Sequence, residues 1–553
     1  MAAGDHIRRS LRSWNRKRSD AARASLTPAS PAGTSAADQR PAAGGEDRAC
    51  AADISRTLLE LAERHAVSDE QMAALLSCAP EDVARRRAEA AALPAESRTQ
   101  PGAELDTPLA PAAPVMPKGN RVDAIVRTVA CLYMLALLSA VLYYKSSFIH
   151  MITISPLLSI YGLIVVSYIT SRFVFSAFYR PGKDHGIEPR VSIVMPGFNE
   201  EAAIAQSLRS LLELNYPADK LEIVAVNDGS TDNTLAEMAK VAATANGRVR
   251  VINFPQNRGK RAAMAAGIRA TEADIVAFVD SDSVLDPDAM RILVQGFHDP
   301  KVGGICGHAD VLNVRENYIT KMQAVRYFVA FLVSKGAESV FNNVTCCSGC
   351  FSAYRREAIM DSLDWWENQT FLGRESTFGD DRSLTNCVLR NWKVKYESRA
   401  VSHTIVPNTF RQFMRQQLRW KRSWTRESLI VATFVWKKNP IAAMSVYVGM
   451  ILPIVAPVVA VHAIVMMPAA GGGAPLLYLV GVYAMSLCYG LYYVTRRGRY
   501  DGLWVYGIVF CFFYLCFLLW QTYYAIATTR SSSWGTRPST AGLGTAEAVQ
   551  VQS

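Results

Sequence analysis

The sequence predicts an α/β domain with a mainly parallel sheet, embedded between N-terminal and C-terminal transmembrane helices. Between residues 190 and 405, short β-branched runs alternate with helical patterns, which is typical of a parallel sheet with helices on both faces. Long apolar runs flank this region on both sides. The composition agrees with a mixture of soluble and membrane parts, because 50% of the 553 residues are hydrophobic and 19% are charged. A mean hydropathy of +0.09 is too low for a chain that lies wholly in a membrane.

The first segment, residues 1–118, is rich in Ala, Arg, Ser and Pro. We expect a mostly disordered cytosolic tail, because such a composition buries too little apolar surface to fold. Leu, Ala and Ile recur at helical spacing over 51–92, which predicts a helical segment there. The basic start of the chain is not followed by an apolar stretch, so no signal peptide is expected.

Two transmembrane helices are expected within residues 119–178, where apolar runs cover about 124–144 and 151–175. Each run is long enough to cross the hydrocarbon core, which takes about 20 helical residues. Arg and Lys flank the pair on its outer sides, so the positive-inside rule places both flanks in the cytosol. The α/β domain that follows is therefore expected to be cytosolic.

The α/β domain is expected over residues 185–409. Residues 410–440 come next and are basic and aromatic, which suits amphipathic helices at a membrane interface. Three further apolar runs then predict transmembrane helices over 441–530, and the chain ends in a polar tail. These runs cover about 441–468, 474–494 and 502–528.

Two carboxylates, Asp280 and Asp282, directly follow an apolar run that predicts a strand. The carboxyl ends of parallel strands are where α/β sheets bind ligands. Carboxylate oxygens suit Mg²⁺ or Mn²⁺, and such an ion can bridge to the phosphates of a substrate. An acidic pair after a strand is often only a turn, so the neighbouring motifs decide its meaning.

Two neighbouring motifs point to a nucleotide diphosphate. Asp228 lies in a polar turn after a predicted strand, where its carboxylate can accept a hydrogen bond from a base or a ribose. Lys260 and Arg261 lie in NRGKR, where both cations can face a diphosphate. Each motif alone reads as a solvated loop, but together they follow successive strands in order.

The remaining candidates supply acid–base chemistry and sugar binding. A second acidic pair, Asp380 and Asp381, lies in GDDR, and Asp381 is the candidate to take the proton of an attacking sugar hydroxyl. The motif QQLRW contains Gln416, Arg419 and Trp420. Its guanidinium can face a leaving diphosphate, and its indole can stack on a sugar or a base.

This set of motifs resembles the processive, membrane-embedded inverting glycosyltransferases with a GT-A domain, namely cellulose, chitin and hyaluronan synthases. The resemblance covers about residues 120–540. It implies that Asp228 and Lys260 contact UDP, and that Asp280 and Asp282 form the DxD motif that binds Mg²⁺ or Mn²⁺. It also implies a general base and a QxxRW motif, which match Asp381 and the set Gln416, Arg419 and Trp420.

Finer matches resemble class I hyaluronan synthases, through NQTFLG, GDDRSLTN, CSGCFSAYRR and WGTR. In that family WGTR belongs to a gating loop over the nucleotide, which here implies roles for Trp534 and Arg537. Cys347 matches the family cysteine beside the acceptor sugar. Cys350 stands where the family usually has Pro, so the shape of the acceptor pocket, and with it the sugar, stays open.

The function implied is a multi-pass enzyme of the cell membrane. It would take UDP-GlcNAc and UDP-GlcA, extend a β-linked polymer and pass it through its own channel. Its partners would be the UDP-sugars, the growing polysaccharide and the lipid bilayer, and nothing in the sequence indicates a nucleic acid or a protein partner. Three alternatives are a chitin or chitin-oligosaccharide synthase that uses UDP-GlcNAc alone, a non-processive membrane glycosyltransferase with a lipid acceptor, and a non-catalytic membrane scaffold or channel.

The gating role constrains the path of the last apolar run. Basic residues before the first C-terminal run and after the second place both points in the cytosol. A simple third crossing at 502–528 would then leave WGTR outside, where it could not cover a nucleotide. The run has about 27 residues, too few for two crossings of about 20 each. We therefore expect a broken or re-entrant run, with Gly502, Gly507 and Gln521 as weak points.

Overall fold

The computed structural model describes the α/β region and most of the apolar runs that follow it. The described ranges are 156–470, 475–497 and 502–531, with single positions between 128 and 139. The expected tail at 1–118, its helix at 51–92 and the loop at 534–537 lie outside the described residues. The first apolar run, at 124–144, is described only at those single positions.

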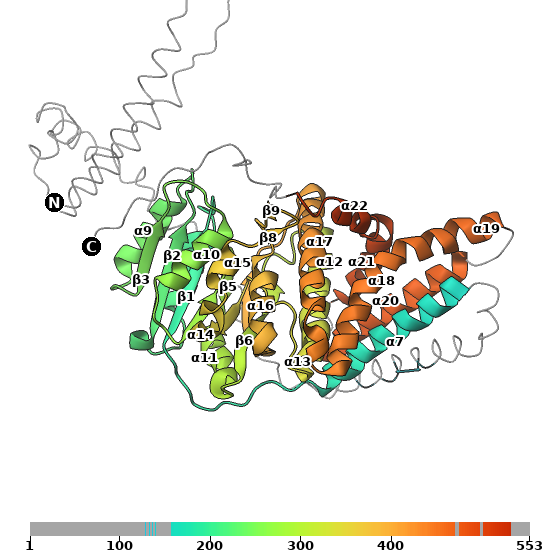
Figure 1. Ribbon diagram of the computed structural model, residues 1–553, viewed down its shortest axis with the longest axis horizontal. Coiled ribbons are helices and arrows are strands. Elements are labelled where there is room, and N and C mark those ends of the chain that lie inside the picture. The colour runs from blue at the N-terminus through green and yellow to red at the C-terminus, as the bar shows by residue number, and fades with distance from the viewer. Residues whose placement is uncertain are drawn as a thin grey trace, which may run out of the picture. The chain divides into compact units, whose positions relative to one another are not determined.

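An eight-stranded sheet forms the α/β domain, with the strand order β3-β2-β1-β4-β7-β6-β10-β5 (Figure 1). The strands are β1 (Val191–Gly197), β2 (Leu221–Asn227), β3 (Val249–Asn253), β4 (Ile275–Phe278), β5 (Ser283–Leu285), β6 (Val302–Val311), β7 (Ser352–Arg355) and β10 (Lys393–Thr404). Strands β3, β2, β1 and β4 pair in parallel, as do β6 and β10, whereas β7 and β5 are antiparallel to their neighbours. The predicted mainly parallel sheet is therefore confirmed.

Helices cover both faces of this sheet. Adjacent residues of β1 point to opposite faces, so Val194 joins one hydrophobic core while Ile193 and Met195 join another. The first core packs against α10, α14, α15 and α16, and the second against α8, α9 and α11. These helices are α8 (Ile204–Leu212), α9 (Thr234–Thr244), α10 (Lys260–Arg269), α11 (Ala289–Val294), α14 (Arg356–Met360), α15 (Leu363–Glu367) and α16 (Asp380–Asn391).

Short elements connect the layers. A two-stranded hairpin between α15 and α16 consists of β8 (Thr370–Phe371) and β9 (Arg374–Glu375). The 3-10 turns η2 (Ala218–Lys220) and η3 (Gln295–His298) lead into β2 and towards β6. Strands β1, β2 and β4 all end at the same edge of the sheet because they run in parallel. The polar motifs that follow these strands are therefore brought together.

Two described helices are long and apolar enough to cross a membrane. They are α7 (Pro156–Phe178) and the helix over Pro440–Ala469, which is made of α18 (Pro440–Val461), the π-helical η6 (His462–Met466) and α19 (Met467–Ala469). They occupy the runs expected at 151–175 and 441–468. α7 packs against α18, and the Tyr161 hydroxyl donates to the Leu452 carbonyl at 3.3 Å. A further helix, α20 (Pro475–Arg497), occupies the run at 474–494 (Figure 1).

The apolar helices pack onto the α/β domain through two of its long helical segments. The first is α12 (Tyr318–Phe328), which continues as the π-helical η4 (Val329–Lys335) and as α13 (Gly336–Val340). Phe328 of α12 shares a hydrophobic cluster with Phe173 of α7 and Tyr493 of α20. The second is the amphipathic α17 (Phe410–Ala432), followed by η5 (Val435–Lys437), within the expected interfacial segment.

The last apolar run is broken, as the sequence predicts. It forms α21 (Trp504–Phe513) and the π-helical η7 (Tyr514–Leu518), and then bends by 47° into α22 (Gln521–Ala527). The break falls directly before Gln521, one of the three predicted weak points. α22 lies against α17, where Arg422 Nε donates to Thr528 Oγ1 at 3.0 Å. Beyond α22, Arg530 Nη2 lies 3.4 Å from the Leu372 carbonyl oxygen of the hairpin, so the chain returns to the α/β domain.

Candidate active site

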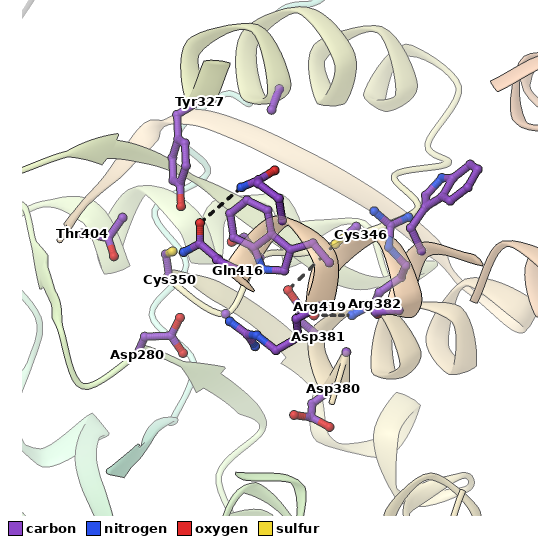
Figure 2. Close-up of a pocket in the computed structure, with 18 of the residues that line it drawn as sticks. Asp280, Tyr327, Cys346, Cys350, Asp380, Asp381, Arg382, Thr404, Gln416 and Arg419 are labelled. Carbon is purple, nitrogen blue, oxygen red and sulfur yellow. Dashed lines mark hydrogen bonds between the residues drawn. The ribbon is translucent and has the colours of Figure 1, made fainter. Parts of the chain in front are cut away.

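A cavity of about 680 Å³ opens at the strand ends and is also walled by α12, α17 and the last apolar run. It gathers nine of the residues that the sequence singled out. These are Asp228, Lys260, Asp280, Asp282, Asp380, Asp381, Gln416, Arg419 and Trp420. Figure 2 labels five of them, namely Asp280, Asp380, Asp381, Gln416 and Arg419. The motifs come from segments almost 200 residues apart in the sequence, and the fold brings them together in one cavity.

Asp228 organises the turn that precedes α10. Its carboxylate accepts hydrogen bonds from the backbone N–H groups of Arg258, at 2.8 Å, and Gly259, at 3.1 Å. It also accepts from the Asn257 amide at 2.9 Å, and only 1% of the residue is exposed. Gly259 has φ = +94°, a conformation that side-chain-bearing residues rarely adopt. The turn therefore presents the N-terminus of α10, with Lys260, to the cavity.

Lys260 and Asp280 form an ion pair inside the cavity. Burial by itself would lower the pKa of Lys260, but attraction by Asp280 and the nearby acidic pair raises it. Asp282 has hydroxyl partners, with Ser283 at 3.2 Å and Thr404 at 3.3 Å. Burial, and then repulsion by Asp280, raises the pKa of Asp282 to about 6. Two carboxylates thus share a single ammonium group, a donor set that suits an additional cation.

The second acidic pair begins α16, and its two carboxylates point in different directions. Gly379 precedes them at φ = +83°, and a Cβ there would lie 1.9 Å from Ser423 Oγ, so only glycine fits. Successive residues on a helix are rotated by about 100°, which separates the two side chains. Asp380 is 4% exposed and pairs with Arg261, whereas Asp381 faces the cavity and lies 4.0 Å from Cys346 Sγ (Figure 2).

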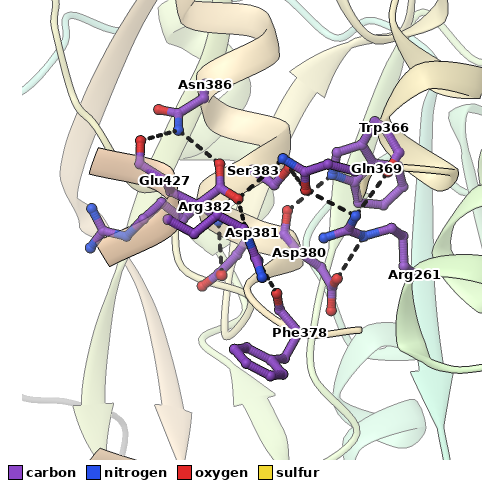
Figure 3. Close-up of polar contacts among 11 residues, drawn as sticks. Arg261, Trp366, Gln369, Phe378, Asp380, Asp381, Arg382, Ser383, Asn386 and Glu427 are labelled. Atoms are coloured by element: carbon purple, nitrogen blue, oxygen red, sulfur yellow. Dashed lines mark hydrogen bonds and ion pairs between the residues drawn. The ribbon is translucent and has the colours of Figure 1, made fainter. Parts of the chain in front are cut away.

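Arg261 does not face a diphosphate, contrary to the sequence-based expectation. Its guanidinium is 5% exposed, lies outside the cavity lining and donates through Nε to Asp380 at 2.9 Å (Figure 3). Nη1 donates at 3.0 Å both to the Trp366 carbonyl and to Gln369 Oε1. Lys260 and Arg261 are consecutive residues of α10, so their side chains leave the helix in different directions and only Lys260 points into the cavity. The Asp380 carboxylate is held in this buried ion pair with Arg261 and is therefore not a free base.

A buried polar network extends from this pair to α17. Gln369 Nε2 donates to Glu427 at 3.2 Å, and Asn386 Nδ2 donates to its other oxygen at 3.1 Å (Figure 3). Arg426 pairs with the same carboxylate at 2.8 Å, and Glu427 is only 1% exposed. Sequence reasoning missed Glu427. The signal for it in the sequence was an adjacent Arg–Glu pair. Arg426 lies seven residues after Arg419 and is therefore on the same helical face.

The cysteine that faces the cavity is not the expected one. Cys347 is fully buried, and its backbone N–H donates to Thr385 Oγ1 at 2.9 Å. Cys346 and Cys350 line the cavity instead. Gly349 lies between them against the ion pair, since a Cβ there would be 2.9 Å from Asp280 and 3.2 Å from Lys260.

The QxxRW residues share one face of α17 because they are spaced by three and four residues. Gln416, Arg419 and Trp420 all line the cavity. Burial lowers the pKa of Arg419, and attraction by Asp381 and Asp380 opposes that effect. The Trp420 ring lies 6.5 Å from the Tyr327 ring of α12, centroid to centroid. This face can bind a diphosphate and a sugar ring next to the carboxylate of Asp381.

Comparisons with known proteins show the family to which this chain belongs. The family model "Glycosyl transferase family 2" matches residues 192–363. A hyaluronan synthase of Streptococcus pyogenes is 30% identical over 419 residues, which are 74% of this chain and 97% of that enzyme. An N-acetylglucosaminyltransferase of Azorhizobium caulinodans is 32% identical over 366 residues, which are 64% of this chain and 88% of that enzyme.

Among solved structures, the mannosyltransferase PcManGT from Pyrobaculum calidifontis, in complex with GDP-Man and Mn²⁺, aligns with a TM-score of 0.45 and 21% identity. The alignment covers 65% of this chain and 99% of that one. The family match and the sheet topology together confirm the expected GT-A domain.

We predict that Arg261→Met destabilises the protein, because it leaves the buried Asp380 carboxylate without its cation. Breaking a buried pair in this way typically costs about 3–5 kcal/mol of unfolding free energy. Denaturant unfolding in detergent measures the change. The control is Arg269→Met on the same helix, whose partly exposed pairs with Asp364 and Glu367 should contribute about 1 kcal/mol or less. If Arg261→Met keeps its stability but loses affinity for UDP, Arg261 contacts the nucleotide, as the sequence analysis expected.

Proposed function

Because this chain belongs to glycosyltransferase family 2, among hyaluronan synthases and related N-acetylglucosaminyltransferases, we propose that it is a membrane polysaccharide synthase that makes hyaluronan from UDP-GlcNAc and UDP-GlcA. One observation carries the proposal. The cavity that holds the acidic motifs is also lined by residues of the apolar segments, namely Pro453, Phe510, Tyr514, Leu518 and Thr522. A product formed at the acidic motifs would thus lie next to the membrane helices. The enzyme would then be multi-pass, with its catalytic domain in the cytosol, where nucleotide sugars are found.

The donor would bind at the edge where β1, β2 and β4 end. Asp228 would accept hydrogen bonds from the base or ribose at the rim of the cavity, and Lys260 would attract the diphosphate. The N-terminus of α10 adds its free N–H groups, which favour a phosphate. Trp534 and Arg537 of WGTR would cover the nucleotide as a gating loop. The return of the chain to the hairpin at Arg530 supports this last assignment.

Asp280 and Asp282 would hold Mg²⁺ or Mn²⁺. The two carboxylates fit such an ion because they are oxygen donors that share only one ammonium partner. No group of three or more His, Cys, Asp or Glu side chains suited to a metal occurs within the described residues. When bound, the ion would neutralise charge on the diphosphate.

Transfer would follow from the placement of Asp381 and Arg419. Asp381 would take the proton of the acceptor hydroxyl as it attacks the anomeric carbon, and Arg419 would stabilise the negative charge that develops on UDP. Trp420 would stack on the acceptor sugar between them. Attack from the face opposite to UDP inverts the α-linked donor and gives a β-linked product.

The base assignment predicts that Asp381→Asn loses transfer while it keeps UDP binding. Removing a general base costs typically about 10²–10⁴-fold in rate. UDP release and UDP affinity, measured on the same protein, separate the two effects. Asp364→Asn, an exposed carboxylate of the same domain, is the control and should keep full activity. A parallel collapse of UDP affinity would make Asp381 a nucleotide ligand instead.

The metal assignment predicts that EDTA silences the enzyme and that added Mn²⁺ restores it. Asp282→Asn should lower transfer by about 10²-fold or more, because the charge of the diphosphate is then poorly compensated. Calorimetry should also show that UDP binds more weakly to this variant in the presence of Mn²⁺. Full activity in the chelator would remove the metal from the proposal.

The sugar assignment is tested by the product. We expect a long polymer only when both UDP-sugars are present, and we expect hyaluronidase to degrade it. The second candidate, a chitin-type synthase, is favoured by the similarity to N-acetylglucosaminyltransferases. A chitinase-sensitive product from UDP-GlcNAc alone would decide for that candidate, and a short lipid-linked product would decide for a lipid acceptor.

A further inference from the structure

The cavity differs in charge between its two ends. Asp280 and Asp282 lie at the strand ends with Lys260, and Asp381 lies near Arg419. The membrane end is formed by α12, α17 and the last apolar run. Its lining comprises Arg326, Tyr327, Trp420, Lys421, Phe510, Tyr514, Leu518 and Thr522. This end contains two cations, and among the described residues neither of them forms an ion pair with a carboxylate.

Arg326 is the less satisfied of the two cations. Its guanidinium lies 5.0 Å from the centroid of the Trp420 ring and 5.7 Å from that of the Phe510 ring. Nη1 is buried without a hydrogen-bond partner among the described residues. Burial lowers the pKa of Arg326, and only tyrosines act against that effect. A buried donor without an acceptor is unfavourable, and more so when it is charged, so this arrangement favours an anionic ligand.

Lys421 adds a second positive charge to the same end. Its ammonium group donates to the Leu518 carbonyl and, at 3.0 Å, to Thr522 Oγ1, and it lies 5.2 Å from the centroid of the Tyr514 ring. Burial, and then repulsion by Arg326, lowers the pKa of Lys421 to about 8. Two mutually repelling cations in a partly desolvated wall are unfavourable unless an anion lies between or beside them.

We infer that Arg326 binds a carboxylate of the polysaccharide, that of a uronate unit in the newly made chain, where the chain passes from the transfer site to the membrane helices. This inference rests on the proposed function, because it takes the cavity to be the place of polymer synthesis. A chain of GlcNAc alone has no anion to offer to Arg326. Stacking on Trp420 would hold either chain, so the cation is what discriminates between them.

A structural role for Arg326 makes a different prediction. If Arg326 only held the Trp420 ring in place, its loss would weaken neutral and acidic chains alike. If it binds a carboxylate, its loss weakens the acidic chain alone. Affinities for two oligosaccharides of equal length and different charge therefore separate the two roles.

The test uses the full chain in nanodiscs, with a hyaluronan hexasaccharide and chitohexaose as probes. We expect the wild type to bind the acidic probe about tenfold more tightly, the effect of one charge-assisted hydrogen bond of about 1.5 kcal/mol or more. Arg326→Gln should remove this preference and leave the affinity for chitohexaose within about twofold. Arg326→Lys should retain part of it. The control is Lys321→Gln, on the same helix and 5.4 Å from the centroid of the Tyr506 ring but outside the cavity lining, which should change neither affinity.

Equal affinity of the wild type for both probes would overturn the inference, even if Arg326→Gln failed to fold. Equal loss of both affinities in a folded Arg326→Gln, or no loss, would overturn it too. The product of the wild type reports separately on the proposed function. An acidic polymer with no preference between the probes refutes only the role of Arg326, whereas a neutral polymer from UDP-GlcNAc alone refutes the proposed function.

Discussion

The buried ion pair between Arg261 and Asp380 fixes the geometry on which the rest of the site depends. It joins α10, which carries Lys260, to α16, which carries Asp381. A buried carboxylate without a cation would take up a proton or force its helix to move. Arg261 neutralises Asp380, whereas the neighbouring Asp381 points towards Cys346 at the cavity wall. Two adjacent, chemically identical side chains thereby acquire different roles.

The same pair anchors a network that reaches the membrane side of the site. Through Gln369 and Glu427 it connects the loop before the hairpin to α17, the helix that carries Arg419 and Trp420. Its contacts cross-link α10, α16 and α17, although Arg261 Nη2 and Asn386 Oδ1 have no hydrogen-bond partner among the described residues. Arg419 and Trp420 on α17 are therefore linked to Asp381 on α16 through contacts outside the cavity, made by Asn386 and Glu427.

The position of α17 also explains why a single cavity serves two environments. One face of this helix packs on the α/β domain, and α22 lies against it after the 47° break in the last apolar run. Phe413 of α17, Met322 of α12 and Leu518 of η7 share one small apolar cluster, which ties the broken run to the catalytic domain. Asp280, Asp282 and Lys260 lie at the strand ends, whereas Arg326 and Lys421 lie beside aromatic rings of the last apolar run.

The sequence alone determined where the strands lie, which polar motif follows each strand, and which residues share a helical face. Periodicity of two or 3.6 residues is a local property, and parallel strands bring their following turns to one edge whatever the details of packing. The motifs around Asp228, Asp280 and Asp381, and the QxxRW face of α17, could therefore be predicted, as could the break in the last run from its length. Which of two adjacent residues faces the cavity could not be predicted from the sequence.

Only the tertiary structure decided that Lys260 rather than Arg261 faces the cavity, that Cys346 rather than Cys347 does so, and that Asp380 pairs with a buried cation. Each choice depends on the rotation of an element about its axis, which is set by contacts with segments far away in the sequence. Glu427 and Arg326 show the same limit. Their surroundings consist of residues from other helices. Glu427 is buried with a cation beside it, whereas Arg326 Nη1 has no hydrogen-bond partner among the described residues, and only the packing of the helices shows this difference.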